Sequence, residues 1–335
     1  MSDTYRIFGS ENSPYSIKVR AYFRFKGIPH EWILRSGETM AEYQKYARLP
    51  IVPAVATPDD EGLQDSTPII EEIERRVPEP SIHPDDPGLR FLSELLEEFG
   101  DEWGNKWMFH YRWAREIDQK TVAHRLVAEM MGDQATEEAI APMAEQIRER
   151  MSGRGFAVGS NEKTAAIIEE DFQQGIEHLE AHLANRPWLF GTRACLADIG
   201  LGAQIYEALI DPTAGTLLRE KAPLTAAWSE RSLDPRSEGE FEDLEGLLPT
   251  LEPILGGEVR FFLRWSNENA RAIEAGAEEM SFEADGRSWW QTVGGPQKYH
   301  AKSLRVLKAK FAEVAGREDL GVLLERTGLR PLLES

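Results

Sequence analysis

The chain has 335 residues and a formal net charge of −20, with 38 Lys and Arg against 58 Asp and Glu. Nucleic acids and anionic membrane surfaces are bound mainly through Lys and Arg, so this composition argues against both as partners. The length favours about two domains with a substantial core. No apolar run has the length of a membrane span and the first residues carry no apolar signal core, so we expect a cytoplasmic protein.

Residues 4–76 alternate short apolar strands with helices, which predicts an α/β domain. In chain order the segments are a strand at Tyr5 to Phe8, an amphipathic helix that opens at Ser13, the pair Val52-Pro53 before the apolar run Ala54 to Ala56, and a third helix after Leu63 to Pro68.

Two of these helix starts carry a serine, at Ser13 and Ser66. A helix N-terminus has unpaired N–H donors and a partial positive charge, so it favours an anion such as a thiolate or a carboxylate. Two such termini can hold the two ends of one small ligand. We also expect a cis peptide bond before Pro53, with the neighbouring backbone polar groups facing a peptide-like ligand.

A polar, Pro-rich stretch from Glu79 to Gly88 then reads as a linker, and helical periodicity follows it. The predicted helices run from Leu89 to about Arg115, from about Thr121 to Met151, from Lys163 to Leu183, and from Ala197 to Leu209. Gly100 and Gly104 are weak points within the first of these four helices.

The C-terminal region departs from this regular pattern. A Glu- and Gly-rich stretch at Ser237 to Gly246 interrupts the helices, and Ser281 to Tyr299 reads as a loop or β-turn region. A last basic helix is predicted from about His300 to Val314.

The chain has one cysteine, Cys195, which excludes an intrachain disulfide framework and every CxxC motif. Cys195 lies at a predicted helix start with Asp198 three positions on, a reciprocal capping pattern, and we favour a buried structural thiol over a reactive one.

His178 and His182 have the spacing of a metal-binding pair. Without a third ligand, a solvated helix surface is favoured and no metal site is predicted.

The segment Ser13-Pro14-Tyr15-Ser16, followed by Val52-Pro53 and Asp65-Ser66, resembles the glutathione-binding domain of glutathione transferases. The opening is similar to that of omega-like members, with Ser in place of Cys. Further along, Trp188 to Gly191 followed by Cys195 to Ile199 resembles the capping-box segment of the family's helical second domain.

This resemblance implies a fold and a domain plan. The fold class is an α/β thioredoxin-like domain, ordered βαβ and then ββα, followed by an all-α helical bundle. The resemblance also implies a homodimer. The implied parts are a glutathione-binding domain at residues 1–80, a linker at 81–88, a helical domain at 89–265, and a partly helical C-terminal extension at 266–335.

The resemblance makes Ser13 the first candidate to donate a hydrogen bond to the glutathione thiolate, with Tyr15 and Ser16 as competing donors. The alternative for Ser13 is a helix N-cap, and the two roles are compatible. The alternative for Tyr15 is packing in the first helical turn. A serine hydroxyl cannot carry thiol–disulfide exchange, so reductase activity is not expected.

The remaining glutathione contacts are also implied by resemblance. Pro14, Val52, Pro53, Asp65 and Ser66 occupy the positions of the family's binding residues. The Val52 backbone would pair with the cysteinyl unit, Ser66 would take the γ-glutamyl carboxylate, and Asp65 would face the ammonium. The alternative is a turn followed by a helix cap.

One departure concerns the glycyl carboxylate of the ligand. Many members have a Lys before the Val-Pro pair, and this chain has Ile51 there. Arg35 and Arg48 are candidate replacements for that anchor.

Trp103, Trp107 and Tyr111 follow each other at four-residue spacing, and with His110 they are the candidate hydrophobic substrate site. The alternative for this aromatic ridge is the protein core.

The resulting hypothesis is a cytoplasmic glutathione transferase. It would use glutathione as co-substrate, need no metal, and conjugate glutathione to a hydrophobic electrophile or isomerise that electrophile. The rival hypothesis is a non-catalytic protein of the same fold that binds glutathione, hydrophobic ligands or another protein.

Overall fold

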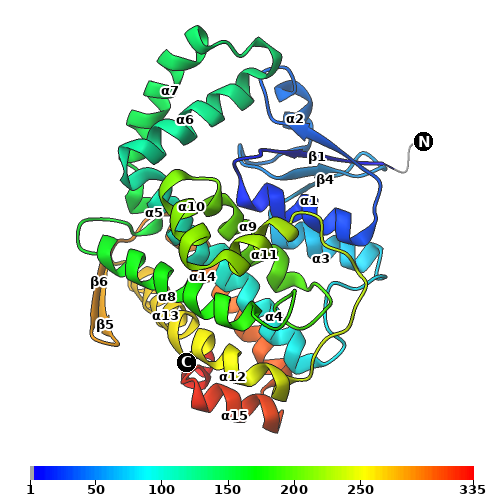
Figure 1. Cartoon of the computed structure of the whole chain (residues 1–335), viewed down its shortest axis with the longest axis vertical. Helices are drawn as coiled ribbons and strands as arrows, with labels where there is room; N and C mark the ends of the chain where they lie inside the picture. The colour runs from blue at the N-terminus through cyan, green and yellow to red at the C-terminus, as the bar shows by residue number, and fades with distance from the viewer. Residues whose placement is uncertain (1–3) are drawn as a thin grey trace.

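The structure is a computed structural model that describes residues 4–335. A small sheet domain lies beside a larger mass of helices, and α6 and α7 form the end of the molecule opposite the C-terminus (Figure 1). Within the described range, no helix combines the length and the apolar character needed to cross a membrane.

The N-terminal sheet has four strands in the order β2-β1-β3-β4. β1 and β2 are parallel, whereas β3 pairs antiparallel with both β1 and β4. This topology confirms the predicted thioredoxin-like order, βαβ and then ββα. The elements are β1 (Tyr5–Gly9), α1 (Pro14–Lys26), β2 (His30–Leu34), α2 (Met40–Tyr46), β3 (Ala54–Ala56), β4 (Gly62–Gln64) and α3 (Ser66–Arg76).

Both faces of this sheet are covered. Successive side chains of a strand point to opposite faces, so Ile7 and Val55 join the main core, which also holds apolar side chains of α1 and α3. Phe8 packs on the other face against Tyr43 and Tyr46 of α2. Apolar side chains thus pack on both faces of the sheet.

The helical part begins with a continuous run through α4, a π-helical turn and α5. The predicted weak points Gly100 and Gly104 are the first and last residues of the π-helical turn. A Cβ on Gly100 would lie 2.7 Å from the Cα of Leu201, so glycine lets this run approach α9 closely. The bounds are α4 (Pro87–Phe99), the π-helical turn (Gly100–Gly104), α5 (Asn105–Ala114) and α9 (Leu196–Leu209).

The prediction of one helix from Thr121 to Met151 is wrong. Gly132 has a φ of +54°, which ends α6, and a short 3-10 turn leads to α7, where the Thr136 hydroxyl accepts the N–H of Ala139 at 3.3 Å. The predictions for α8 and α9 are confirmed. The other helices here are α6 (Glu116–Met131), α7 (Glu137–Ser152), α8 (Ala165–Leu183), α10 (Pro212–Lys221), α11 (Pro223–Arg231), α12 (Leu244–Ile254) and α13 (Arg260–Glu274).

The start of α9 is organised around the buried carboxylate of Asp198. Its Oδ1 accepts the backbone N–H of Leu189 and the indole N–H of Trp228, both at 2.8 Å. Its Oδ2 accepts the backbone N–H of Cys195 at 2.9 Å and the Cys195 thiol at 3.2 Å. The predicted capping pair and the buried thiol are both confirmed.

The C-terminal extension is built into the helical part. α13 runs across residue 265, the predicted end of the helical domain. The region predicted as a loop holds a β-hairpin, whose Trp289 is buried. Arg287 of this hairpin donates to Asp171 of α8 at 2.8 Å. The predicted basic helix is confirmed as the greater part of α14. The elements are β5 (Glu279–Ala284), β6 (Arg287–Thr292), α14 (Gly295–Val314), α15 (Glu318–Arg326) and α16 (Arg330–Glu334).

Candidate functional site

The strand register brings the three predicted ligand-binding segments to one end of the sheet. Phe8 pairs with Ala54, and Ala54 pairs with Gln64. The end of β1, the start of β3 and the end of β4 therefore lie side by side. Ser13, Val52-Pro53 and Asp65-Ser66 come directly from these three strand ends, far apart in the sequence but adjacent in the fold.

The Val52-Pro53 peptide bond is cis, as predicted from the sequence. Pro53 is buried and Val52 is half-buried. Neither the N–H nor the C=O of Val52 has a hydrogen-bond partner among residues 4–335. The Val52 backbone thus presents one donor and one acceptor, which is what pairing with an extended peptide requires.

The loop before Pro53 is held by Gln64, a residue that the sequence analysis missed. Its side-chain oxygen accepts the N–H groups of Arg48 and Leu49 at 3.0 and 2.9 Å, and its amide N–H groups donate to the carbonyls of Leu49 and Ile51 at 2.7 and 2.9 Å. The Tyr43 hydroxyl donates to the same two carbonyls. No local pattern marks Gln64, because its partners lie 13 to 16 residues earlier in the chain.

Ser13 is the N-cap of α1, and its oxygen accepts the N–H of Ser16 at 3.3 Å. The Ser13 O–H has no acceptor in the described part of the chain, so it can still donate to a ligand. The cap and the donor role are therefore compatible in this geometry.

Tyr15 and Ser16, the competing donors, face elsewhere. The Tyr15 hydroxyl donates to the backbone carbonyl of Asp101 at 2.9 Å, which ties α1 to the helical part. Burial, and then the nearby Asp101 carboxylate, raise the pKa of Tyr15 well above its usual value. Ser16 is fully buried, and its hydroxyl oxygen has no partner among the described residues. Of the three predicted donors, Ser13 is thus the one with a free O–H on a half-buried side chain.

Asp65 and Ser66 form the start of α3. Asp65 has a φ of +80°, an uncommon conformation for a residue with a side chain, of the kind that is found at ligand sites. Its carboxylate accepts a hydrogen bond from the hydroxyl of Tyr299 in α14. Ser66 is the first residue of the helix, and neither its N–H nor its hydroxyl has a partner within residues 4–335.

The candidate anchors for a glycyl carboxylate lie beside the same loop. Arg35 donates to the Pro50 carbonyl at 3.0 Å, and its guanidinium carbon lies 5.6 Å from the centre of the Tyr43 ring. The side chains of Arg48 and Ile51 are exposed.

A buried ion cluster fixes the site against the helical part. The ammonium group of Lys18 lies 2.6 Å from Asp101, pairs with Glu97, and donates to the Thr67 hydroxyl of α3 at 3.0 Å. Burial alone would lower the pKa of Lys18, but Asp101 and Glu97 raise it overall. Burial raises the pKa of Asp101. α1 and α3, which carry Ser13 and Ser66, are thereby held on α4 and the turn that follows it.

The aromatic ridge of the predicted hydrophobic site lies in the core. The indole N–H groups of Trp103 and Trp107 donate to Asp171 at 2.6 and 3.0 Å, and Tyr111 packs on Phe172. These three aromatic residues are at most 1% exposed. Contact between them and a substrate stays a prediction, and the structure shows them as packing residues.

His110, the fourth residue of that predicted site, is also buried. Its Nδ1 lies 2.8 Å from the Ser160 hydroxyl, and its Nε2 lies 3.0 Å from Glu169. Burial lowers its pKa, although Glu169 opposes this effect.

His182 is buried as well, so the predicted solvated helix surface is wrong for this residue. Its Nε2–H donates to the Leu189 carbonyl at 2.7 Å, and its Nδ1 lies 2.8 Å from the Thr250 hydroxyl. His178 is half-buried and contacts Glu258. Across residues 4–335, no three His, Cys, Asp or Glu side chains are grouped to hold a metal ion.

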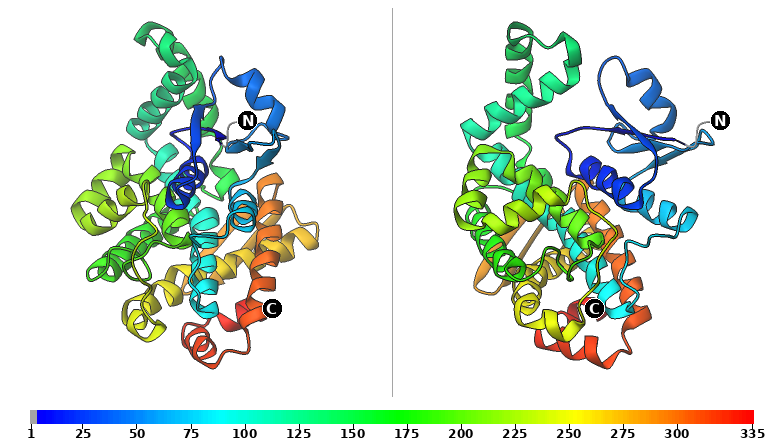
Figure 2. Two further views of the ribbon diagram at one scale, coloured as in Figure 1. Left: turned by 90° about the vertical axis from the view of Figure 1, so that its right-hand side faces the viewer. Right: turned by 45° about the vertical axis from the view of Figure 1, so that its right-hand side comes forward.

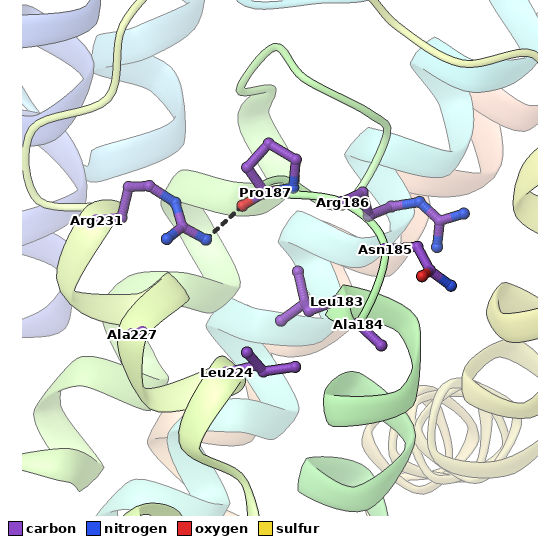
Figure 3. A pocket seen from close by; sticks show the side chains of 8 residues that line it. All are labelled: Leu183, Ala184, Asn185, Arg186, Pro187, Leu224, Ala227 and Arg231. Carbon is purple, nitrogen blue, oxygen red and sulfur yellow. Dashed lines mark hydrogen bonds between the residues drawn. The ribbon is translucent and has the colours of Figure 1, made fainter.

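Two shallow pockets lie away from the strand ends. One, of about 320 Å³, lies between the end of α8 and α11, where Arg231 donates to the Pro187 carbonyl at 2.6 Å (Figure 3). The other, of about 300 Å³, lies between the end of α13 and the start of α14. Neither is lined by a residue of the candidate site. The first is lined by Leu183, Ala184, Asn185, Arg186, Pro187, Leu224, Ala227 and Arg231.

Comparison with known proteins adds a family match for the N-terminal part. Residues 7–81 match the family model described as the N-terminal domain of glutathione S-transferase. No curated protein matches the sequence. This match covers the strand ends and all three segments of the candidate site.

Several solved structures are similar over most of their length. A glutathione S-transferase from Methylobacterium radiotolerans, in complex with glutathione sulfonate, is 20% identical, with 72% of this chain and 99% of that chain covered and a TM-score of 0.40. The β-etherase LigF from Sphingobium sp. strain SYK-6 is 22% identical, with 68% and 93% covered and a TM-score of 0.46. FzlA from C. crescentus is 17% identical, with 75% and 92% covered and a TM-score of 0.43.

The family match and the topology of the sheet agree on the same residues. The chain therefore has a glutathione S-transferase-family fold, in which a thioredoxin-like N-terminal domain precedes a mostly helical remainder.

Proposed function

We propose that this protein is a glutathione transferase that binds glutathione at the strand ends and presents its thiolate to a hydrophobic electrophile. One observation carries the proposal. Unpaired polar groups of Ser13, Val52 and Ser66 come together at one end of the sheet, within a domain whose sequence matches the family.

Each of these groups suits one part of the tripeptide. The Val52 N–H and C=O pair with the backbone of the cysteinyl unit. The N–H and hydroxyl of Ser66 donate to the γ-glutamyl carboxylate at the positive end of α3. Asp65 faces the ammonium of the same unit. Together these contacts place the cysteinyl sulfur near the start of α1.

Ser13 then acts on the sulfur. A cysteinyl thiol has a pKa of about 8.5, and lowering it by about two units requires roughly 2.7 kcal/mol of preferential stabilisation of the thiolate. The Ser13 hydroxyl donates to the sulfur, and the N-terminus of α1 adds a favourable field. The thiol proton leaves to solvent, the thiolate forms a C–S bond with the electrophile, and the leaving group departs with its electron pair.

A second candidate is a protein that binds glutathione without turnover. It is favoured by the burial of Trp103, Trp107 and Tyr111, because these side chains offer no exposed wall for a hydrophobic substrate. Binding and turnover must therefore be measured separately.

The test is calorimetric titration of the full chain with reduced glutathione, beside turnover of a generic aryl halide. Ser66→Ala should weaken binding about 10- to 100-fold, because it removes a hydrogen bond to a charged group. Ser13→Ala should bind nearly as well as the unmodified protein but transfer glutathione far more slowly. Ser152→Ala, at the exposed end of α7, is the matched control.

Each outcome separates the candidates. Binding that depends on Ser66, together with turnover that depends on Ser13, supports the transferase. Binding without turnover supports the second candidate. No binding at millimolar glutathione contradicts both.

A further inference from the structure

The C-terminal extension reaches the candidate site through Tyr299. The hydroxyl of Tyr299, in the first turns of α14, donates to the carboxylate of Asp65 at the start of α3. The two residues are 234 positions apart in the chain. In Figure 2, α14 (orange) runs beside α4 (cyan), and these two helices pack against each other.

The backbone around Tyr299 is anchored on the helical part. The side-chain amide of Asn269 in α13 donates to the carbonyl of Gln297 at 2.8 Å. The ring of His300 packs edge-on against Trp265, with 5.1 Å between ring centres, and pairs with Glu102. Gln297 and His300, which lie on either side of Tyr299 in the helix, are thus buried and held in place, and the phenol position does not depend on Asp65 alone.

A second contact holds α14 against α3. The ammonium group of Lys310 lies 2.9 Å from Glu71 of α3 and 3.6 Å from Glu94 of α4. α14 is therefore docked on the sheet domain at two points, Tyr299 on Asp65 and Lys310 on Glu71.

Asp65 and Tyr299 can each accept a further hydrogen bond while the bond between them is in place. The phenol donates to one carboxylate oxygen of Asp65, and the other oxygen has no partner within the described residues. The phenol oxygen itself keeps lone pairs that can accept a hydrogen bond. Tyr299 is 47% exposed, so a ligand can reach it. Partial burial of the side chain, and then its bond to Asp65, raise the pKa of Tyr299, so the phenol keeps its proton at neutral pH.

We propose that Tyr299 is a ligand-binding residue, and that its oxygen and the free carboxylate oxygen of Asp65 together accept the α-ammonium group of the γ-glutamyl unit. This inference rests on the proposed function and assigns a binding role to the C-terminal extension. An ammonium has three N–H donors, so two acceptors on adjacent side chains suit it. The extension thus makes the site selective for ligands with a free α-amino group.

The alternative role for Tyr299 is that of a gate. In that case Tyr299 blocks Asp65, and its side chain must move away before a ligand can bind. The two readings predict opposite effects for loss of the hydroxyl, because a gate would open whereas a binding residue would be lost.

The experiment compares two ligands on the full chain by calorimetry: glutathione, and the analogue glutaryl-cysteinyl-glycine, which lacks only the α-amino group. Tyr299→Phe should weaken glutathione binding about 10- to 100-fold, the effect of one lost hydrogen bond to a charged group, and change binding of the analogue less than twofold. Asp65→Asn should also reduce the ratio of the affinity for glutathione to the affinity for the analogue.

Tyr22→Phe is the matched control, because Tyr22 of α1 also donates to a carboxylate, that of Glu74 in α3, at 2.7 Å. That pair lies farther along both helices from the strand ends, so Tyr22→Phe should leave the preference between the two ligands unchanged.

The outcomes are distinct from those for the proposed function. If the unmodified protein binds no glutathione, the proposed function fails and this inference fails with it. If it binds and Tyr299→Phe binds equally well, or loses both ligands equally, only the role of Tyr299 is overturned. Tighter binding by Tyr299→Phe would establish the gate in its place.

Discussion

The ammonium group of Lys18 in α1 lies 2.6 Å from the carboxylate of Asp101, and both groups are buried where the sheet domain meets the helical part. Lys18 also pairs with Glu97, so one cation serves two carboxylates. Because buried charges are costly when unpaired, this cluster favours the relative position of the two parts in which Lys18 keeps both partners.

Replacement of Lys18 by Met should lower the free energy of unfolding by about 3–5 kcal/mol, because two buried carboxylates lose their counter-charge. Guanidinium unfolding of the two proteins measures this difference. The control is Lys120→Met, since Lys120 forms an exposed pair with Glu116 on α6 and should change stability little. A loss for Lys18→Met as small as that of the control would mean that the cluster contributes little.

Gln64 should keep the loop before Pro53 in one conformation. Its side-chain oxygen accepts the N–H groups of Arg48 and Leu49, which belong to no helix or strand. In Gln64→Ala these two amides should exchange with deuterium faster, and glutathione should bind more weakly. Hydrogen exchange read at single residues tests the first effect, and calorimetry tests the second. Gln44→Ala, an exposed position on α2, should alter neither.

Lys106 should make the free energy of unfolding depend on pH in the alkaline range. Its amine donates to the Val158 carbonyl at 3.1 Å and lies 3.7 Å from the centre of the Trp265 ring, and burial lowers its pKa to about 7. An unfolded lysine, with a pKa of about 10.4, binds a proton between pH 7 and 10 that the folded protein does not bind. The unfolded state binds more protons there, so this group adds stability as pH rises through the window and removes it as pH falls.

Unfolding measured from pH 7 to pH 10 tests this coupling. Lys106→Met should remove an upward slope of at most about 1.4 kcal/mol per pH unit, whereas the exposed Lys302→Met should keep it. Identical slopes in the unmodified protein and Lys106→Met would show that the amine is charged in the folded state.

Cys195 should be inert to thiol reagents in the native protein. Its sulfur is fully buried, and burial followed by the nearby Asp198 carboxylate raises the pKa of the thiol well above its usual range. Modification should therefore occur only when the protein unfolds, at a rate that rises with denaturant. The same reagent in guanidinium provides the positive control, and rapid labelling of native protein would contradict the assignment.

The features that could be predicted from the sequence are mostly local. The Ser13 cap of α1, the pairing of Cys195 with Asp198, and the cis bond before Pro53 each depend on residues a few positions apart. The order of strands and helices in the sheet domain was readable for the same reason, since apolar periodicity is a property of short segments.

The one long helix predicted across Gly132 was wrong for a physical reason. Helical periodicity continues past Gly132, and only its positive φ shows that α6 ends there. The sequence also left two alternatives open for Trp103 and Trp107. They form an aromatic ridge whether they face a substrate or the core, and Asp171, more than sixty residues away, accepts both indole N–H groups. Periodicity reports which residues share a face, but not what covers that face.

By itself, the sequence determined the sheet domain, its family resemblance, and the residues that begin α1, β3 and α3, because those signals lie within short segments. Tertiary structure alone decided that Gln64 holds the loop before Pro53, that Lys18 joins the two parts, and that Tyr299 meets Asp65. The physical reason is that a polar side chain takes whichever partner packing brings within hydrogen-bond distance, and sequence separation does not encode that choice.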